Sequence, residues 1–210
     1  MISSLAQLRA LYAAPGERAV RKQLDRLDVH DRRFVALAPF CVVASAGTDG
    51  ALLDVSPRGG TPGFVKASED GATLWLPDSG GNNRLDTLEN LLVDPRISLI
   101  FMIPGVDETL RVNGTALLRD EPTFTHRFAQ ERQQPKLVIE VAVREAYLHC
   151  AKAFMRSQLW QADTAVSRNA LPSMNQMIHD QIGAGPVTES AAETMARYRL
   201  QIEGEQGIRP

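Results

Sequence analysis

The sequence predicts an α+β domain, in which a mainly antiparallel β-barrel carries helices at both ends. Apolar residues recur at helical spacing in the first 38 residues and in the last third of the chain. Between them, in residues 39–145, β-rich segments alternate with Gly, Asn and Asp turns, and one helix (84–93) is inserted. Because the strands are joined mostly by hairpins, a βαβ arrangement is not indicated. We expect residues 1–210 to form one domain.

Composition excludes several classes of protein. The 210 residues are 44% hydrophobic and 23% charged, as in ordinary globular chains, and the net charge of −2 disfavours a general nucleic-acid binder. No apolar run approaches the roughly 20 residues that cross a bilayer. Arg9 interrupts the first apolar stretch, which makes a poor signal peptide, so we expect a cytoplasmic protein. Cys41 and Cys150 are then expected to be reduced thiols.

Three helices are expected in residues 1–38. Ser3 or Ser4 can cap the first, which carries an apolar stripe and ends before Pro15. The second is expected over 17–27. Asp31 could cap the third, whose inward-facing residues would be Phe34, Val35 and Leu37.

The barrel segment, residues 39–145, is predicted to contain about six strands. The β-rich stretches are 40–45, 51–56, 64–67, 73–76, 97–103, 109–118 and 136–143. Tight turns are expected at 47–50 and at Asp70-Gly71. The nearly continuous apolar run 97–103 predicts a strand buried on both faces, and a short helix is expected after Asp120. The inserted helix presents Leu85, Leu88, Leu91 and Leu92 at helical spacing.

Helices are expected to fill most of residues 146–203, at 147–160, 172–183 and 188–201. On the first of these, a 3.6-residue period places His149, Lys152, Arg156 and Trp160 on one side. This basic stripe is either a solvated face or a surface that closes over an anionic aromatic ligand. The period does not decide between the two.

The familiar catalytic and nucleotide motifs are absent. The sequence contains no GxGxxG after a strand, no GxxxxGK[ST], no GxSxG, no HExxH and no CxxC. Only His149 and Cys150 are adjacent potential metal ligands, and neighbours on a helix diverge by about 100°, so no metal site is expected. No side chain stands out as a catalytic acid or base.

Two glycine-containing segments could bind an anion. Ser56-Pro57-Arg58-Gly59-Gly60 leaves a strand, and Gly80-Gly-Asn-Asn-Arg84 precedes the inserted helix. Unpaired amides and the dipole at a helix start favour an anion, and a guanidinium binds phosphate through two parallel hydrogen bonds. In the alternative interpretation, Asn83 caps the helix, Asp86 completes a capping box and Arg84 is solvated.

An ordered series of motifs runs from about residue 30 to residue 161. Its main pieces are Asp54-Val-Ser-Pro-Arg-Gly-Gly60, Gly81-Asn-Asn-Arg-Leu-Asp86, Glu108-Thr-Leu-Arg-Val-Asn-Gly114 and His149-Cys-Ala-Lys-Ala153, followed by Arg156-Ser157 and Leu159-Trp160. In this order they resemble the pyridoxamine 5′-phosphate oxidase-related proteins of the FMN-binding split-barrel superfamily. The resemblance implies a six-stranded antiparallel split barrel that forms a homodimer, with one FMN in each of two clefts between subunits.

The same resemblance implies roles for individual residues. The first candidate for binding the FMN phosphate is Arg84 with Asn83, the second is Arg58 with Ser56, and the third is Lys66. Thr109 and Arg111 would face the isoalloxazine ring. Lys152, Arg156 and Trp160 would reach the ligand from the other subunit or line the substrate side. The implied function is an FMN-dependent oxidoreductase acting on a small molecule. The alternatives are a non-catalytic flavin carrier or sensor, a deazaflavin protein, a haem protein with His149 as ligand, and a purely structural dimer module.

One departure limits the implied activity. Authentic pyridoxamine phosphate oxidases carry an Arg-x-Val-Leu-Leu-Lys strand and a Ser-Arg-Lys helix start. The corresponding segments here read Leu53-Asp-Val-Ser-Pro-Arg58 and Asn82-Asn-Arg84. Synthesis of pyridoxal phosphate is therefore not expected.

Overall fold

The computed structural model of the chain describes residues 1–47, 52–130 and 134–205. Its strands are β1 Phe40–Ala46, β2 Leu53–Gly59, β3 Lys66–Ala67, β4 Thr73–Pro77, β5 Arg96–Ile103, β6 Val106–Arg119 and β7 Val138–His149. Its α-helices are α1 Leu5–Leu11, α2 Glu17–Arg21, α3 Val29–Leu37, α4 Asp86–Val93, α5 Pro122–Thr125, α6 Lys152–Ser157, α7 Met174–Ile182 and α8 Ala191–Glu205. Short 3₁₀ turns are η1 His126–Phe128, η2 Ala162–Thr164 and η3 Arg168–Ala170.

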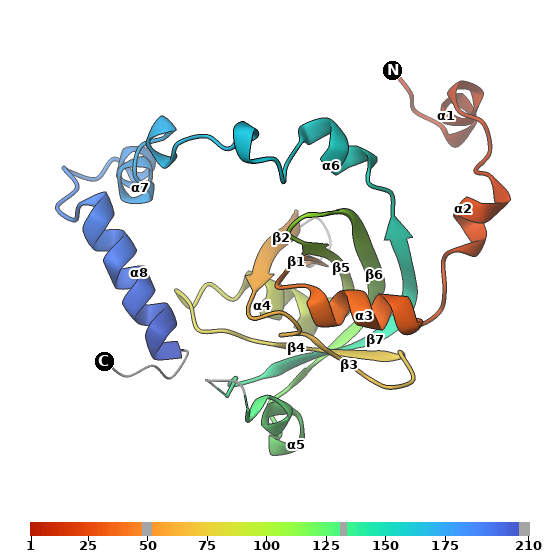
Figure 1. The fold of residues 1–210 in the computed structure, drawn as a ribbon, viewed down its shortest axis with the longest axis horizontal. Coiled ribbons are helices and arrows are strands. Elements are labelled where there is room, and N and C mark those ends of the chain that lie inside the picture. Colours follow the sequence, from red (N-terminus) through yellow and green to blue (C-terminus); the bar gives the residue numbers. More distant parts are fainter. Residues whose placement is uncertain (48–51, 131–133, 206–210) are drawn as a thin grey trace.

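The described strands form one antiparallel sheet in the order β2-β1-β5-β6-β7-β4-β3 (Figure 1). This confirms the α+β class, the antiparallel sheet and the terminal helices, with α4 inserted between β4 and β5 as predicted. The sheet has seven strands rather than about six, since each of the seven β-rich stretches forms one, including the short edge strand Lys66–Ala67 that pairs with β4. It is also not a closed barrel: the edge strands β2 and β3 do not pair with each other. Pro57 lies within β2, where it lacks the N–H that another strand would need.

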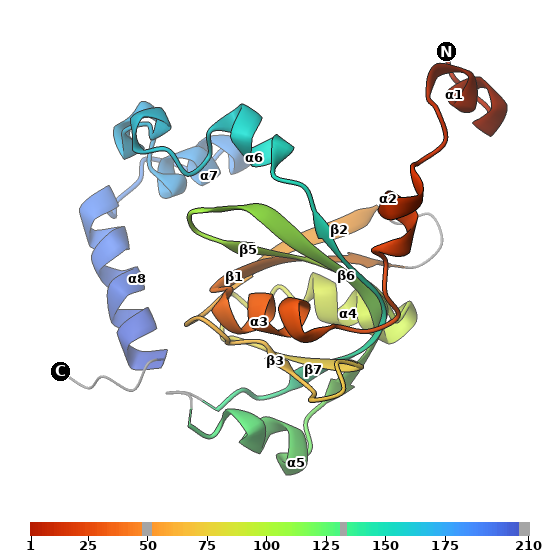
Figure 2. The ribbon, with the colours of Figure 1, turned by 45° about the vertical axis from the view of Figure 1, so that its right-hand side comes forward.

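The sheet is strongly curved (Figure 2). Its longest strands, β6 and β7, pair from Arg119↔Val138 to Thr109↔His149, and the register shifts between Asn113 and Gly114. A β-bulge of this kind bends a strand and increases its twist. The bend wraps the sheet around its own apolar face.

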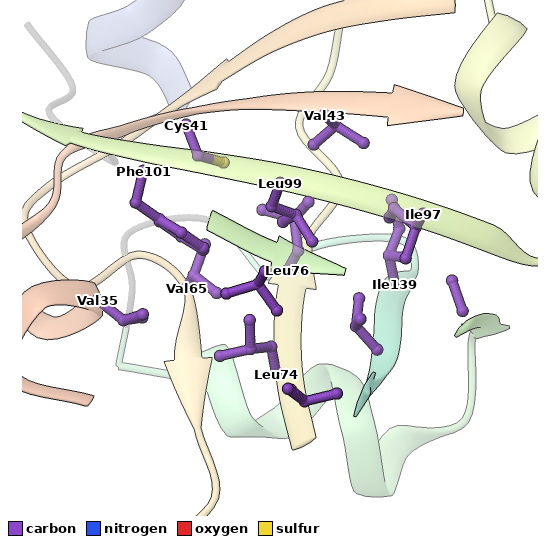
Figure 3. Close-up of a cluster of buried hydrophobic side chains, with 14 of the residues drawn as sticks. Val35, Cys41, Val43, Val65, Leu74, Leu76, Ile97, Leu99, Phe101 and Ile139 are labelled. Carbon is purple, nitrogen blue, oxygen red and sulfur yellow. The ribbon is translucent and has the colours of Figure 1, made fainter. Parts of the chain in front are cut away.

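That inner face forms the core. Cys41, Val43, Leu74, Leu76, Leu99 and Phe101 are all at most 2% exposed, and Figure 3 shows them in one cluster. Burial raises the pKa of the Cys41 thiol to about 12. Cys41 and Cys150 are both free, as expected from the sequence.

Two of the N-terminal helices differ from the prediction. Ser4 caps α1 as expected, but α2 ends at Arg21 instead of residue 27. The reason is tertiary: Leu24 forms an antiparallel bridge with Ala146 of β7, which takes the backbone out of the helix. Asp28, not Asp31, is the N-cap of α3; Asp31 is instead the second member of that capping box. Leu37, expected to face inward, is exposed.

The hairpin between β3 and β4 turns at Gly71, as predicted. Gly71 has a φ of 72°, and its carbonyl accepts a hydrogen bond of 2.9 Å from the Leu27 amide. An added Cβ would lie 2.0 Å from the Leu27 carbonyl oxygen, so only glycine fits this contact. The other turn, predicted at 47–50, falls largely outside the described residues.

The C-terminal region contains less helix than predicted. Instead of a helix over 147–160, β7 continues to His149 and the helix α6 spans only Lys152–Ser157. Pairing with the 14-residue strand β6 extends β7, and this long-range pairing overrides the local helical period. The predicted helices near 172–183 and 188–201 are present as α7 and α8, and the short helix after Asp120 as α5.

Candidate functional site

One edge of the sheet presents polar side chains to the inner face. In the register of β1 and β2, Ser56 lies opposite Val43 and Arg58 opposite Cys41, and both partners belong to the core. Directly opposite residues share a face of the sheet. The side chains of β2 on this inner face are Asp54, Ser56 and Arg58.

Arg58 is the cation of this row, and 21% of its side chain is exposed. Its Nη1 lies 3.5 Å from Oδ1 of Asp78, which is a long contact for an ion pair. Its Nε is buried, and no acceptor for it exists among the described residues. Burial raises the pKa of the Asp78 carboxyl, although the positive charges of Arg58 and Lys136 oppose that shift. Arg58 thus retains a donor without an acceptor in the described part of the chain.

The segment before α4 carries the second predicted cation. Asn83 has a φ of 61°, a left-handed conformation that Asn tolerates better than most residues. The N-cap of α4 is Leu85, with no side-chain cap, so the expected cap at Asn83 and the expected capping box are wrong. Arg84 precedes the helix, is exposed, and donates from Nε to Oδ2 of Asp86 at 2.5 Å.

Two side-chain contacts tether residues 78–87 to β2. Besides Arg58–Asp78, the Thr87 hydroxyl donates to Oδ2 of Asp54 at 3.0 Å. The structure therefore brings the predicted phosphate-binding residues of the two segments to one edge of the sheet. We call this group the anion site; it consists of Ser56, Arg58, Asn83 and Arg84.

Lys66 is not part of this group. In β3 it lies opposite Trp75, whose neighbours Leu74 and Leu76 point into the core. Lys66 and Trp75 therefore project from the other face of the sheet. The Lys66 ammonium lies 5.8 Å from the centroid of the Phe128 ring.

Thr109 and Arg111 line a pocket on the face opposite the core. The cavity has a volume of about 460 Å³ and is formed by β1, β2, β5, β6, the end of β7 and α6. Its lining residues are Val42, Ala44, Val55, Ser98, Leu99, Ile100, Thr109, Arg111, Asn113, His149, Cys150, Ala153 and Phe154. We call it the outer-face pocket.

The polar groups of this pocket gather on β6 and β7. Thr109 pairs with His149, and the Arg111 guanidinium lies 5.2 Å from the centroid of the Tyr147 ring. Asn113 donates to the Glu145 carboxylate at 2.7 Å. With aliphatic walls on β1, β2 and β5, the pocket is suited to a flat apolar molecule with a polar or anionic edge.

Most of these pocket residues were not singled out from the sequence. The apolar run 97–103 was predicted to be buried on both faces, but only Ile97, Leu99 and Phe101 are buried. Ser98 and Ile100 face the pocket. The apolar run itself could have predicted this pocket. In a sheet with one core face, a strand that is apolar on both sides leaves an apolar patch on the other face for a ligand or partner.

The basic stripe predicted on one helix is not formed. His149 ends β7, while Lys152 and Arg156 are exposed on α6. Trp160 follows α6; its Nε1 donates to the Val106 carbonyl at 3.0 Å, and its ring stacks on Phe154 at 5.4 Å. Trp160 therefore supports a pocket residue, whereas Lys152 and Arg156 point elsewhere on the surface.

Two other kinds of feature are missing from the described ranges. No three His, Cys, Asp or Glu side chains there are grouped so that they could hold a metal ion. No helix in the same ranges has the length and apolar character that spanning a membrane requires.

The family of the chain follows from a comparison with family models. The model described as pyridoxamine 5′-phosphate oxidase matches residues 27–150, more than half of the chain. The chain belongs to the pyridoxamine 5′-phosphate oxidase family. The match includes all of the anion site and the outer-face pocket up to Cys150, and it leaves out α1, α2 and everything from α6 onward.

Solved structures of other proteins are similar at low identity. HupZ from Group A Streptococcus has a TM-score of 0.46 and 16% identity, over 58% of this chain and 93% of that one. General Stress Protein 26 from Bacillus anthracis has a TM-score of 0.41 and 10% identity, over 57% and 94% of the two chains. At such low identities and TM-scores, the two structures do not indicate which ligand this chain binds. A search of curated proteins found no match.

Proposed function

We propose that this member of the pyridoxamine 5′-phosphate oxidase family binds FMN and acts as an FMN-dependent oxidoreductase on a small molecule. The observation that carries the proposal is Arg58, a largely buried guanidinium whose Nε has no acceptor within the described structure. An unsatisfied buried donor is unfavourable by about 1–3 kcal/mol, and a phosphate oxygen would satisfy it. The residues present thus fit the phosphate end of FMN.

The anion site can exchange its internal contacts for a phosphate. The Arg84–Asp86 pair is exposed and contributes little to the stability of the folded chain, and the 3.5 Å Arg58–Asp78 contact is too long for a well-formed hydrogen bond. Ser56 lies between Asp54 and Arg58 on the same face of β2 and would donate its hydroxyl. Asn83 would add a side-chain amide beside Arg84.

The outer-face pocket fits the ring end of the same ligand. Its aliphatic walls would bury the isoalloxazine, while Thr109 and Arg111 would donate to polar atoms of the ring edge. When bound, FMN supplies the two-electron redox chemistry. The chain's own contribution would be to orient the ring, exclude water from it and place positive charge near it.

The two halves of this proposed site face opposite sides of one sheet. Ser56 and Arg58 share the core face, whereas Thr109 and Arg111 line the other face. We therefore propose a homodimer in which each FMN takes its phosphate contacts from one copy and its ring contacts from the other. In that shared site Trp160 would hold Phe154 in place, while the exposed Lys152 and Arg156 of α6 would reach the ligand held by the other copy.

An absorbance spectrum of the purified protein, before and after incubation with FMN, tests the proposal. We expect a flavin spectrum and release of FMN on heating, identified by mass. Turnover with NAD(P)H or candidate small amines distinguishes an oxidoreductase from a flavin carrier. A protein that stays colourless after incubation would contradict FMN binding.

Substitution of the two arginines tests the assignment of the phosphate site. If Arg58 donates two charge-assisted hydrogen bonds to the phosphate, Arg58→Ala is expected to weaken FMN binding by about 1.5–3 kcal/mol, roughly ten- to a hundredfold. Arg84→Ala should weaken it less, because Arg84 is exposed. Arg33→Ala, an exposed arginine of α3, is the matched control. Fluorescence titration with FMN measures all three; equal affinities would refute the assignment.

His149 favours a second candidate, a haem protein. It lines the outer-face pocket at the end of β7, where an imidazole could ligate iron. A Soret band in the purified protein that disappears in His149→Ala would support haem. A flavin spectrum with no Soret band would exclude it.

A further inference from the structure

The first 23 residues form an arm that needs a covering surface. Every side chain in this N-terminal arm is exposed, including Leu5, Leu8 and Leu11 along one side of α1. The two helices of the arm have only seven and five residues. Helices this short are marginal in water without tertiary packing. The arm is joined to the sheet at its base, where Lys22 Nζ donates to the Leu148 carbonyl at 2.6 Å.

Residues 174–205 form a second arm with the same property. In this C-terminal arm, α7 exposes Met174, Ile178 and Ile182, which lie on one side at i, i+4 and i+8. The two helices are fixed to each other, because Asn175 donates to the Glu189 carboxylate at 2.8 Å and Arg197 pairs with the same carboxylate. The arm is therefore a defined unit with an uncovered apolar stripe.

The two arms have opposite charge. The N-terminal arm contains four basic residues and one acidic residue, for a net charge of +3. The C-terminal arm contains five acidic and two basic residues, for a net charge of −3. Two apolar stripes with complementary charge are the features expected of two surfaces that associate.

Within one copy the arms lie on opposite sides of the sheet, as both Figures 1 and 2 show. They therefore do not cover each other in the same chain. We propose that the N-terminal arm of one copy packs against the C-terminal arm of a second copy, so that the arms clamp the dimer together. This inference rests on the homodimer of the proposed function. It goes beyond it, because both arms lie outside the family match.

Charge reversal in the 210-residue chain tests the pairing. Arg9→Glu with Arg18→Glu reverses the N-terminal arm, and Asp180→Lys with Glu203→Lys reverses the C-terminal arm. We expect each pair of changes to raise the dimer dissociation constant at least tenfold in sedimentation experiments at low salt. The chain with all four changes should return to within threefold of wild type, because attraction is restored. Arg33→Glu, on α3, is the control and should leave the constant unchanged.

Cross-linking shows directly whether the contact joins two copies. Unlabelled and ¹⁵N-labelled chains are mixed, treated with a carbodiimide and digested for mass spectrometry. The expected products join Lys22 or the N-terminal amine of one isotope to acidic residues of 174–205 of the other. Cross-links only within one isotope would overturn the proposal.

The outcomes separate this inference from the proposed function. A wild-type chain that sediments as a monomer contradicts the dimer itself, and the arm pairing with it. A dimer that binds FMN but is equally stable in all charge variants refutes only the arm pairing. The arm pairing is also refuted if both charge-reversed variants lose the dimer and the variant with all four changes does not recover it.

Discussion

Arg58 illustrates how one position combines structural and functional constraints. Its Cα lies opposite that of Cys41 at the rim of the core, so its aliphatic stem is buried while its guanidinium reaches Asp78. A lysine there would keep the charge but lose the planar pair of donors that binds phosphate. The glycines after Arg58 led to the prediction that it binds an anion, whereas its burial and its unsatisfied Nε depend on the fold.

Asp31 gives a pH-dependent prediction. Burial, with the nearby Asp28 charge as second cause, raises the pKa of this 4% exposed carboxyl above 3.8. The folded chain then binds the proton more tightly than the unfolded chain, so this group lowers the free energy of unfolding as pH rises from 3.8 to the folded pKa. Asp31→Asn removes the effect and can keep the capping contact.

We therefore expect the Asp31→Asn variant to gain stability relative to wild type through that pH window, and to hold a constant advantage above it. Urea denaturation at a series of pH values measures the difference. A difference that does not change with pH would contradict the assigned pKa shift.

At the scale of elements, helical spacing was reliable where no distant strand competed. The predicted α1, α4, α7 and α8 are all present within a few residues. Residues 22–27 and 147–149 also have a helical pattern, but Leu24 and His149 form β pairs with Ala146 and Thr109. A strand gains its hydrogen bonds from a partner remote in sequence, which a local pattern does not contain.

The bulge between β6 and β7 gives a prediction for an element. A Cβ on Gly114 would lie 2.2 Å from the Ala142 carbonyl oxygen, a backbone atom that cannot move without shifting β7. Gly114→Ala should lower the free energy of unfolding by about 1–3 kcal/mol, as overpacking does. Gly185→Ala, where no heavy atom lies within 4 Å, is the control. Chemical denaturation of both variants checks this; equal stabilities would mean that the bulge adjusts freely.

At the scale of the whole molecule, the proposed FMN site draws on both faces of the sheet, and for this reason it would need a second copy of the chain. Suppose that each FMN is bound by Arg58 of one copy and Arg111 of the other. In a homodimer of the Arg58→Ala chain, or of the Arg111→Ala chain, both sites then lack one of the two arginines. A heterodimer of Arg58→Ala and Arg111→Ala chains would then contain one intact site and one doubly altered site.

Mixing equal amounts of these two variants should therefore restore tight binding at roughly a quarter of all sites, because half of randomly paired dimers are mixed. Titration with FMN after unfolding and refolding the mixture measures that fraction. No recovery would indicate that each site belongs to a single chain.

The sequence by itself determined the class of the fold and the position of the inserted helix, and it predicted an anion site in two glycine-containing segments. These depend on local spacing and on the chemistry of individual residues. Only the tertiary structure decided which face each strand turns inward, where β7 and α2 end, and that Lys66 lies apart from Ser56 and Arg58. The physical reason is that strand pairing and the outer-face pocket join residues from 42 to 154, and their energies depend on partners far along the chain.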